Sequence, residues 1–223
     1  IMPFTLTDIN EMNSFKIGDS VHFDFLWGKK GTKAKNFKYI GVGHIPVRDK
    51  FFSDQYSTKE VGDTLDNVTL LDLDSNKISL YQYDGDYLFI SYIFSRCPMP
   101  NLCPAIFMKN KILANEFIDR KELKFILVSF DYKHDTPSVL RDIYEPSIEG
   151  NTNLEIWSST GYIENIYQLV KQSGGDFWGV EQGKIGHKLV SILVGPQKEV
   201  LGVWSGEKWE VRKVSNSISM IIN

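Results

Sequence analysis

The chain is poor in cysteine and histidine and has no excess of basic residues. Its 223 residues include two Cys and four His, and 25 Lys and Arg stand against 28 Asp and Glu, a net charge of −3. Two Cys cannot form a disulfide framework, and a nucleic-acid-binding surface would need a basic excess. The longest apolar run, Tyr87–Phe94, is far shorter than the ~20 residues that span a bilayer. We therefore expect no nucleic-acid partner, and membrane contact only through an anchor upstream of Ile1.

Apolar residues make up 42% of the chain and charged residues 24%, which is ordinary for a globular protein with a packed core. The pattern divides the chain into residues 1–41, a linker over 42–60, and residues 61–223. From residue 61, strand-length apolar runs alternate with helical patterns, which predicts an α/β fold with a central sheet and flanking helices. The predicted strands are 68–73, 77–80, 87–94, 125–130, 154–158, 189–194 and 200–204, and the predicted helices are 104–119, one from 138, 160–173 and 211–222.

Both cysteines lie in one proline-rich segment between a predicted buried strand and a predicted helix. The segment reads Ser95-Arg96-Cys97-Pro98-Met99-Pro100-Asn101-Leu102-Cys103-Pro104. Such strand-to-helix edges are where open α/β sheets place their sites. Pro104 suits the first helical position, so we expect Cys103 at the N-cap, where N–H groups and the helix dipole stabilise a thiolate. Arg96 adds positive charge next to Cys97.

Two thiols on one stiff loop suit a soft metal such as Cu(I), and they also suit reversible disulfide exchange. A static disulfide is an alternative, although so short a loop gains little closure entropy. A pair of inert buried thiols is another alternative, which the proline-rich setting disfavours. Zinc is disfavoured because structural zinc normally takes four Cys or His ligands, usually at shorter spacing.

His187 is the histidine best placed to join the cysteines. It lies in Gly183-Lys184-Ile185-Gly186-His187-Lys188, a predicted loop just before the strand 189–194. This loop belongs at the end of the sheet, where Gly183 and Gly186 leave backbone room for close approach. Neutral imidazole is a common copper ligand, and the alternative is a solvated loop histidine. We expect the other three histidines to be exposed or inert: His22, His44 and His134.

Four pieces of sequence, in order, resemble the Sco/SenC family of thioredoxin-like copper proteins. The resemblance covers about 160 residues, and it implies a thioredoxin-like fold with a copper site formed by Cys97, Cys103 and His187. Asp131 matches an acidic position near that site. The matching pieces are Val61-Gly62-Asp63, Phe94-Ser95-Arg96-Cys97-Pro98 through Cys103-Pro104, Ser129-Phe130-Asp131 with Asp135-Thr136-Pro137, and Gly186-His187.

The family resemblance also implies a function and a location. Such a protein is a metallochaperone that delivers copper to the binuclear Cu(A) centre of respiratory cytochrome oxidase, or reduces the thiols of that target. The partner would be the oxidase copper subunit or another periplasmic copper protein, met in the periplasm or at a membrane facing it. The loop departs from the commoner family pattern, because five residues and not three separate Cys97 and Cys103. It resembles a longer Cys-Pro-x-Pro-x-x-Cys-Pro variant of some bacterial members, so metal geometry and redox potential could differ.

The first forty residues resemble the end of a CusF-type periplasmic copper-binding barrel, a small OB-like β-barrel. Met2-Pro3-Phe4 and Gly18-Asp19 match that family, and predicted strands over Val21–Phe25 and Ala34–Ile40 follow. The resemblance implies a partial barrel whose opening strands would precede Ile1, and it makes Met2 a candidate thioether ligand for Cu(I). The alternative is that Met2 is simply an apolar residue.

Two other functions share the predicted fold. A periplasmic thiol–disulfide oxidoreductase would use Cys97 and Cys103 as its redox pair, although the common Trp-Cys-x-x-Cys motif and the usual cis-proline before the third core strand are absent. A peroxiredoxin-like peroxidase normally has a Thr two to three residues before its reactive cysteine, together with an Arg elsewhere in the fold. Ser95-Arg96 is a poor substitute for that arrangement.

Overall fold

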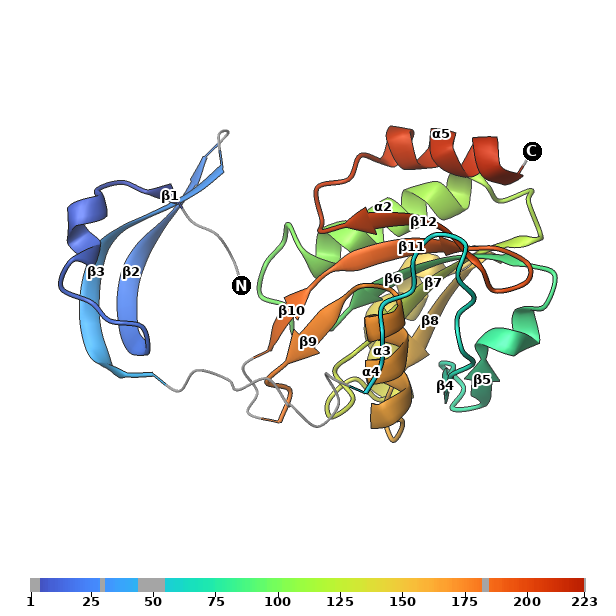
Figure 1. The fold of residues 1–223 in the computed structure, drawn as a ribbon, viewed down its shortest axis with the longest axis horizontal. Coiled ribbons are helices and arrows are strands. Elements are labelled where there is room, and N and C mark those ends of the chain that lie inside the picture. Colours follow the sequence, from blue (N-terminus) through green and yellow to red (C-terminus); the bar gives the residue numbers. More distant parts are fainter. Residues whose placement is uncertain (1–4, 29–30, 44–54, 182–184, 223) are drawn as a thin grey trace. The chain divides into compact units, whose positions relative to one another are not determined.

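The computed structural model of the chain describes residues 5–28, 31–43, 55–181 and 185–222. The chain forms two compact units, residues 1–47 and residues 48–223, and each is considered by itself (Figure 1). None of the described helices is both long and apolar enough to cross a bilayer.

The first unit is a small three-stranded sheet. Its elements are β1 (Thr5–Leu6), the 3-10 turn η1 (Ile9–Met12), β2 (Asp19–Gly28) and β3 (Gly31–Val42). The strand order is β1-β3-β2, with β1 parallel and β2 antiparallel to β3. Among the described residues of this unit only Ala34 is a buried hydrophobic. The described strands form an open sheet, so the partial barrel stays a prediction.

The second unit is built on a seven-stranded mixed sheet. The order is β12-β11-β6-β7-β8-β4-β5, in which β6, β7 and β8 are parallel and the other pairs are antiparallel. The apolar runs of β6, β7 and β11 are buried, as is typical of strands covered on both faces. The strands are β4 (Thr69–Leu71), β5 (Lys77–Ser79), β6 (Tyr87–Ile93), β7 (Leu123–Ser129), β8 (Leu154–Ser158), β11 (Val190–Val194) and β12 (Val200–Ser205).

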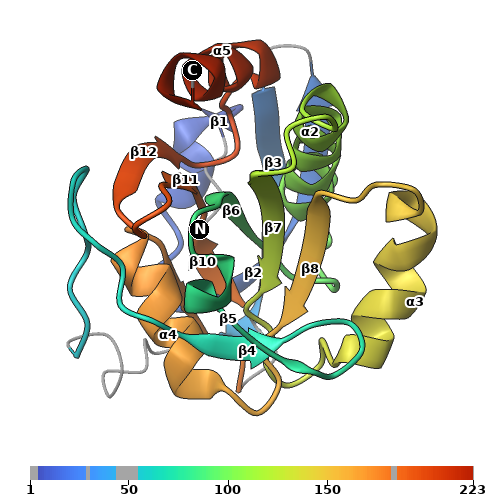
Figure 2. The same cartoon turned by 90° about the vertical axis from the view of Figure 1, so that its right-hand side faces the viewer.

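Helices cover both faces of this sheet. Successive side chains of a strand point to opposite faces, and two neighbours on β6 show it: Ser91 bonds Asn110 of α2 at 3.1 Å, whereas the Tyr92 hydroxyl donates to the Leu169 carbonyl of α4 at 3.2 Å. Figures 1 and 2 show the resulting layers. The expected central sheet with flanking helices is therefore confirmed. The helices are α2 (Cys103–Glu116), α3 (Pro137–Ile148), α4 (Ile163–Gln172) and α5 (Val211–Ile222), with a 3-10 turn η2 (Leu80–Tyr83) before β6.

A separate two-stranded ribbon carries His187. Strand β9 (Asp176–Trp178) pairs with β10 (Gly186–Lys188) antiparallel, and His187 lies opposite Phe177. The expectation of a loop here is wrong, because three-residue strands are too short to show an alternating pattern. Gly186 makes the pairing possible, since a Cβ at this position would lie 2.4 Å from the Trp178 ring.

Candidate metal centre

Cys97 lies within the loop that joins β6 to α2, and Cys103 lies where this loop enters α2. A turn opens the loop, in which the N–H of Cys97 donates to the Phe94 carbonyl at 3.3 Å. Cys103 is the first residue of α2, and Leu102 is the N-cap. The prediction placed Cys103 at the N-cap, one position before the helix begins, because Pro104 was expected to be the first helical residue. Pro104 is tolerated one position later, since the first N–H groups of a helix have no intrahelical partner.

The two thiols are free and differ in environment: Cys97 is half-buried and Cys103 is buried. Hydrogen bonds to the Cys103 side chain and to the backbone of Cys103 and Met99 lower the pKa of Cys97 to about 6, although burial opposes them. The hydrogen bond to Cys97 and burial together raise the pKa of Cys103 far above its usual range. The expectation that Cys103 is the stabilised thiolate is therefore wrong, because the hydrogen bond to Cys97 and burial outweigh the helix terminus. Cys97 is the thiol with the lower pKa.

Arg96 does not act on Cys97 as expected. Its Nε and Nη2 donate to Oδ2 of Asp131 at 2.9 and 2.7 Å, and Asp131 is fully buried two residues after the end of β7. The other Asp131 oxygen accepts the N–H of His134 at 3.3 Å. The Arg96 charge is thus paired with a buried carboxylate, and Arg96 is not among the groups that lower the pKa of Cys97.

A second buried carboxylate, Asp135, was missed as a site residue. The sequence predicted a helix from residue 138, and α3 begins at Pro137, where Thr136 caps it by accepting the Val139 N–H at 3.3 Å. The Asp135 side chain turns instead toward the cysteine loop, where it accepts the N–H of Ser95 at 2.8 Å. Its partner is 40 positions away in sequence, so no local pattern could have revealed the contact.

His187 packs against two aromatic rings beside the start of the cysteine loop. Its ring centroid is 5.5 Å from that of Phe94 and 5.6 Å from that of Phe130. Burial lowers the pKa of His187 to about 4, so the imidazole is neutral near pH 7. Its Nδ1 atom is buried and has no hydrogen-bond partner. Buried polar atoms are rarely left unpaired, and an unpaired imidazole nitrogen can serve as a metal ligand.

The structure brings the predicted ligands into one region but does not close them around one point. The thiols of Cys97 and Cys103 lie close enough to shift each other's pKa, and His187 contacts Phe94, whose carbonyl holds the Cys97 turn. Within the described ranges, the only trio of His, Cys, Asp or Glu with ligand atoms within 4.8 Å of one another is Asp131, His134 and Asp135. Hydrogen bonds already occupy these carboxylates.

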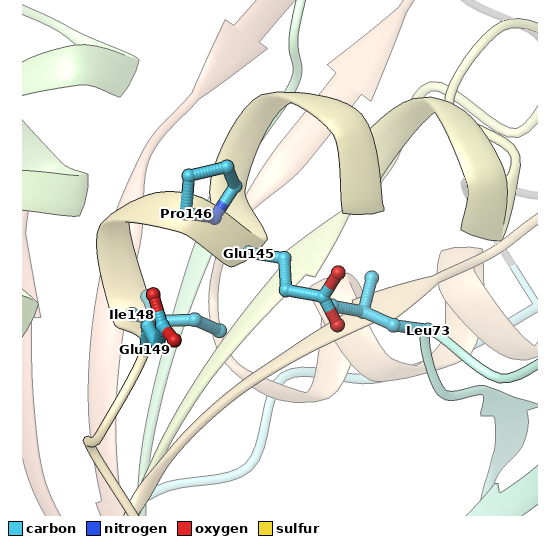
Figure 3. A pocket seen from close by; sticks show the side chains of 5 residues that line it. All are labelled: Leu73, Glu145, Pro146, Ile148 and Glu149. Carbon is cyan, nitrogen blue, oxygen red and sulfur yellow. The ribbon is translucent and has the colours of Figure 1, made fainter.

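The remaining candidate residues are exposed or lie outside the described residues. Met2 and His44 lie outside the described residues. His22 is exposed on β2, and His134 is exposed, as expected. A surface hollow of about 570 Å³ lies at the C-terminal end of α3, and none of the predicted ligands lines it (Figure 3). Its lining residues are Leu73, Glu145, Pro146, Ile148 and Glu149.

Fold and site together define a thioredoxin-like protein with a dithiol loop after a central strand and a half-buried histidine beside it. The sequence profile of the SCO1/SenC family matches residues 57–223, and the chain belongs to this family. No curated protein sequence matches the chain significantly.

Solved structures of Sco proteins share the fold at low sequence identity. An SCO1/SenC family lipoprotein from Bacillus anthracis str. Ames is 15% identical with a TM-score of 0.64, and the match covers 75% of this chain and 100% of that one. BsSco, described as a cytochrome c oxidase assembly protein with a disulfide switch, is 19% identical (TM-score 0.59; 73% and 95% covered). Yeast Sco1 with copper bound is 17% identical (TM-score 0.53; 72% and 93% covered).

Proposed function

We propose that the chain is a metallochaperone that binds copper through Cys97, Cys103 and His187 and serves assembly of the Cu(A) centre of respiratory cytochrome oxidase. The observation that most supports this is the buried Nδ1 of His187, which bonds no group of the protein. It lies beside Phe94, at the start of the loop that carries both thiols. Membership of the SCO1/SenC family and the copper bound to yeast Sco1 support the choice of metal.

The donor set fits copper as cargo. Two sulfurs and one neutral imidazole are soft to intermediate ligands, which favour Cu(I) over hard cations. Near pH 7 Cys97 is largely a thiolate because its pKa is about 6, whereas Cys103 must lose its proton when a metal binds. The three donors do not yet surround one point, so binding must draw His187 and the sulfurs together.

The partner and the compartment follow from the same proposal. The recipient would be the copper subunit of cytochrome oxidase or another periplasmic copper protein, and the chaperone would work in the periplasm or anchored to a membrane facing it. The family relation to a lipoprotein and to a cytochrome c oxidase assembly protein supports this. Met2 stays a candidate thioether ligand.

Copper stoichiometry of the reduced protein tests the proposal. We expect about one Cu per chain, a Cu(II)–thiolate charge-transfer band after loading with Cu(II), and loss of both in Cys97→Ala, Cys103→Ala and His187→Ala. His22→Ala is the matched control, because this histidine is exposed on β2. If His187→Ala bound copper as tightly as the parent protein, the three-ligand site would be wrong.

A thiol–disulfide oxidoreductase is the second candidate, and the asymmetry of the two thiols favours it. The Cys97 thiolate would attack a target disulfide and release one target thiolate. Cys103 would then lose its proton and attack the mixed disulfide at the Cys97 sulfur, releasing the second target thiol. The target is reduced by two electrons, and the chain is oxidised to a Cys97–Cys103 disulfide. A reduction potential below about −300 mV would instead indicate a static structural disulfide.

A further inference from the structure

The fully buried carboxylate of Asp135 reaches from the start of α3 to the residues that precede Cys97. Its Oδ2 accepts the backbone N–H of Ser95 at 2.8 Å, and Oδ1 accepts the Ser95 hydroxyl. The Ser129 hydroxyl, at the end of β7, also donates to Oδ2. The ring Nδ1 of His134 lies 3.1 Å from Oδ1. One carboxylate thus accepts hydrogen bonds from both donors of a single loop residue, the N–H and the hydroxyl of Ser95.

The Asp135 side chain has a fixed position because hydrogen bonds hold the Asp135 backbone at the ends of two strands. Its N–H donates to the Asp131 carbonyl at 2.9 Å. Its own carbonyl accepts hydrogen bonds from the hydroxyls of Ser158, at the end of β8, and Thr160, the latter at 3.2 Å. The carboxylate therefore acts from a fixed position, and Ser95 cannot move without breaking charge-assisted hydrogen bonds in a buried setting.

Ser95 stands two residues before Cys97, and the intervening backbone folds into the turn closed by the Cys97 N–H and the Phe94 carbonyl. Fixing Ser95 therefore fixes the start of this turn and the direction in which the Cys97 side chain leaves it. We propose that Asp135 is a positioning residue, which acts through Ser95 to hold the sulfur of Cys97 beside Cys103. The inference concerns the metal-free dithiol, so it can succeed or fail independently of copper binding.

The experiment uses the full, metal-free, reduced chain and iodoacetamide as the probe. The rate of Cys97 alkylation at pH 7, followed by mass spectrometry, should change about fivefold in Asp135→Asn and in Ser95→Ala, because the Cys97 sulfur is no longer held at one position beside Cys103. The Cys97–Cys103 disulfide, equilibrated with glutathione, should become easier to reduce, with an equilibrium constant changed about fivefold, because two sulfurs that are no longer held together form a disulfide less readily.

Ser173→Ala is the matched control, because it removes a buried hydroxyl that bonds Tyr92 at 2.6 Å and takes no part in holding Asp135 or Ser95. It should leave both the alkylation rate and the glutathione equilibrium unchanged. Parent-like values in folded Asp135→Asn, or equal changes in Ser173→Ala, would overturn the proposal. If Asp135→Asn does not fold, as judged by circular dichroism, Ser95→Ala decides the question alone, and parent-like values there would overturn it.

Discussion

At the scale of single residues, the chemistry of the loop depends on the difference between its two thiols. Cys97 has a pKa of about 6 and is half-buried, whereas Cys103 is buried and protonated. We predict that iodoacetamide modifies Cys97 of the metal-free protein first. The rate should be half-maximal near pH 6 and level above about pH 7, because only the thiolate reacts. Cys103 should react only after unfolding.

The pH profile of alkylation, resolved by peptide mass spectrometry, checks this. Cys103→Ser is an informative comparison, because it replaces the thiol that lowers the pKa of Cys97 with a hydroxyl of similar size. The half-maximal pH should then change. Preferential modification of Cys103, or a Cys97 profile centred near the ordinary thiol pKa of about 8.5, would contradict the assignment of Cys97 as the nucleophile.

At the scale of elements, the short β9–β10 ribbon decides where His187 lies. Gly186 of β10 packs so closely on Trp178 of β9 that a Cβ would fall 2.4 Å from the ring. Gly186→Ala must therefore displace the indole or shift β10, which moves His187 relative to the cysteine loop. We predict that Gly186→Ala lowers Cu(I) affinity at least about tenfold, a loss typical of a displaced metal ligand or its support.

Gly202→Ala is the control for crowding alone, because a Cβ there would lie 2.8 Å from the Trp204 ring of β12, which does not carry His187. Affinity can be measured by competition with a Cu(I) chelator, and stability by urea unfolding. Both variants should lose stability, but only Gly186→Ala should lose copper. Unchanged copper affinity in a folded Gly186→Ala would show that the ribbon does not set the ligand position.

The elements differ in how far the sequence predicted them. The bounds of β8 (Leu154–Ser158) and α5 (Val211–Ile222) agree with the prediction, because each has a clear period and length. The β9–β10 ribbon was missed because its strands are too short for a period. The cysteine loop was predicted as a site because two cysteines in one proline-rich segment indicate metal binding or thiol chemistry. The roles of neighbouring residues such as Asp135 were not predicted, because they arise from contacts between segments that are distant in sequence.

At the scale of the whole molecule, buried tyrosines make the stability of the fold depend on pH. Burial raises the pKa of Tyr92 far above its usual value, and its hydroxyl bonds Ser173 at 2.6 Å in the core. In the unfolded chain tyrosine ionises near pH 10, so above that pH the unfolded state binds fewer protons than the native one. Stability should therefore fall as pH rises above about 10, by about 1.4 kcal/mol per pH unit for one such tyrosine.

Urea unfolding of the parent and Tyr92→Phe between pH 7 and 11 isolates this contribution. Tyr92→Phe should cost about 1 kcal/mol at pH 7, because it removes a buried hydrogen bond and leaves a partner unpaired. The difference should shrink and then reverse as pH rises above 10. A constant difference across the whole range would show that Tyr92 ionises alike in both states.

The buried core is distributed unevenly along the chain, and this predicts how the second unit behaves without the first. Apart from Ala34, every buried hydrophobic of the described ranges lies between Leu65 and Ile218, so the described hydrophobic core belongs to the second unit. We expect a chain of residues 48–223 to keep the unfolding midpoint of the full chain within about 2 °C, well below the shift that 1 kcal/mol produces. It should bind about one Cu(I) when reduced, as the full chain does, because a lone thioether such as Met2 is a weak ligand without further soft donors. Calorimetry and metal analysis of both chains test this. A second Cu(I) bound only by the full chain, and lost in Met2→Ala, would show that the first unit carries its own copper site.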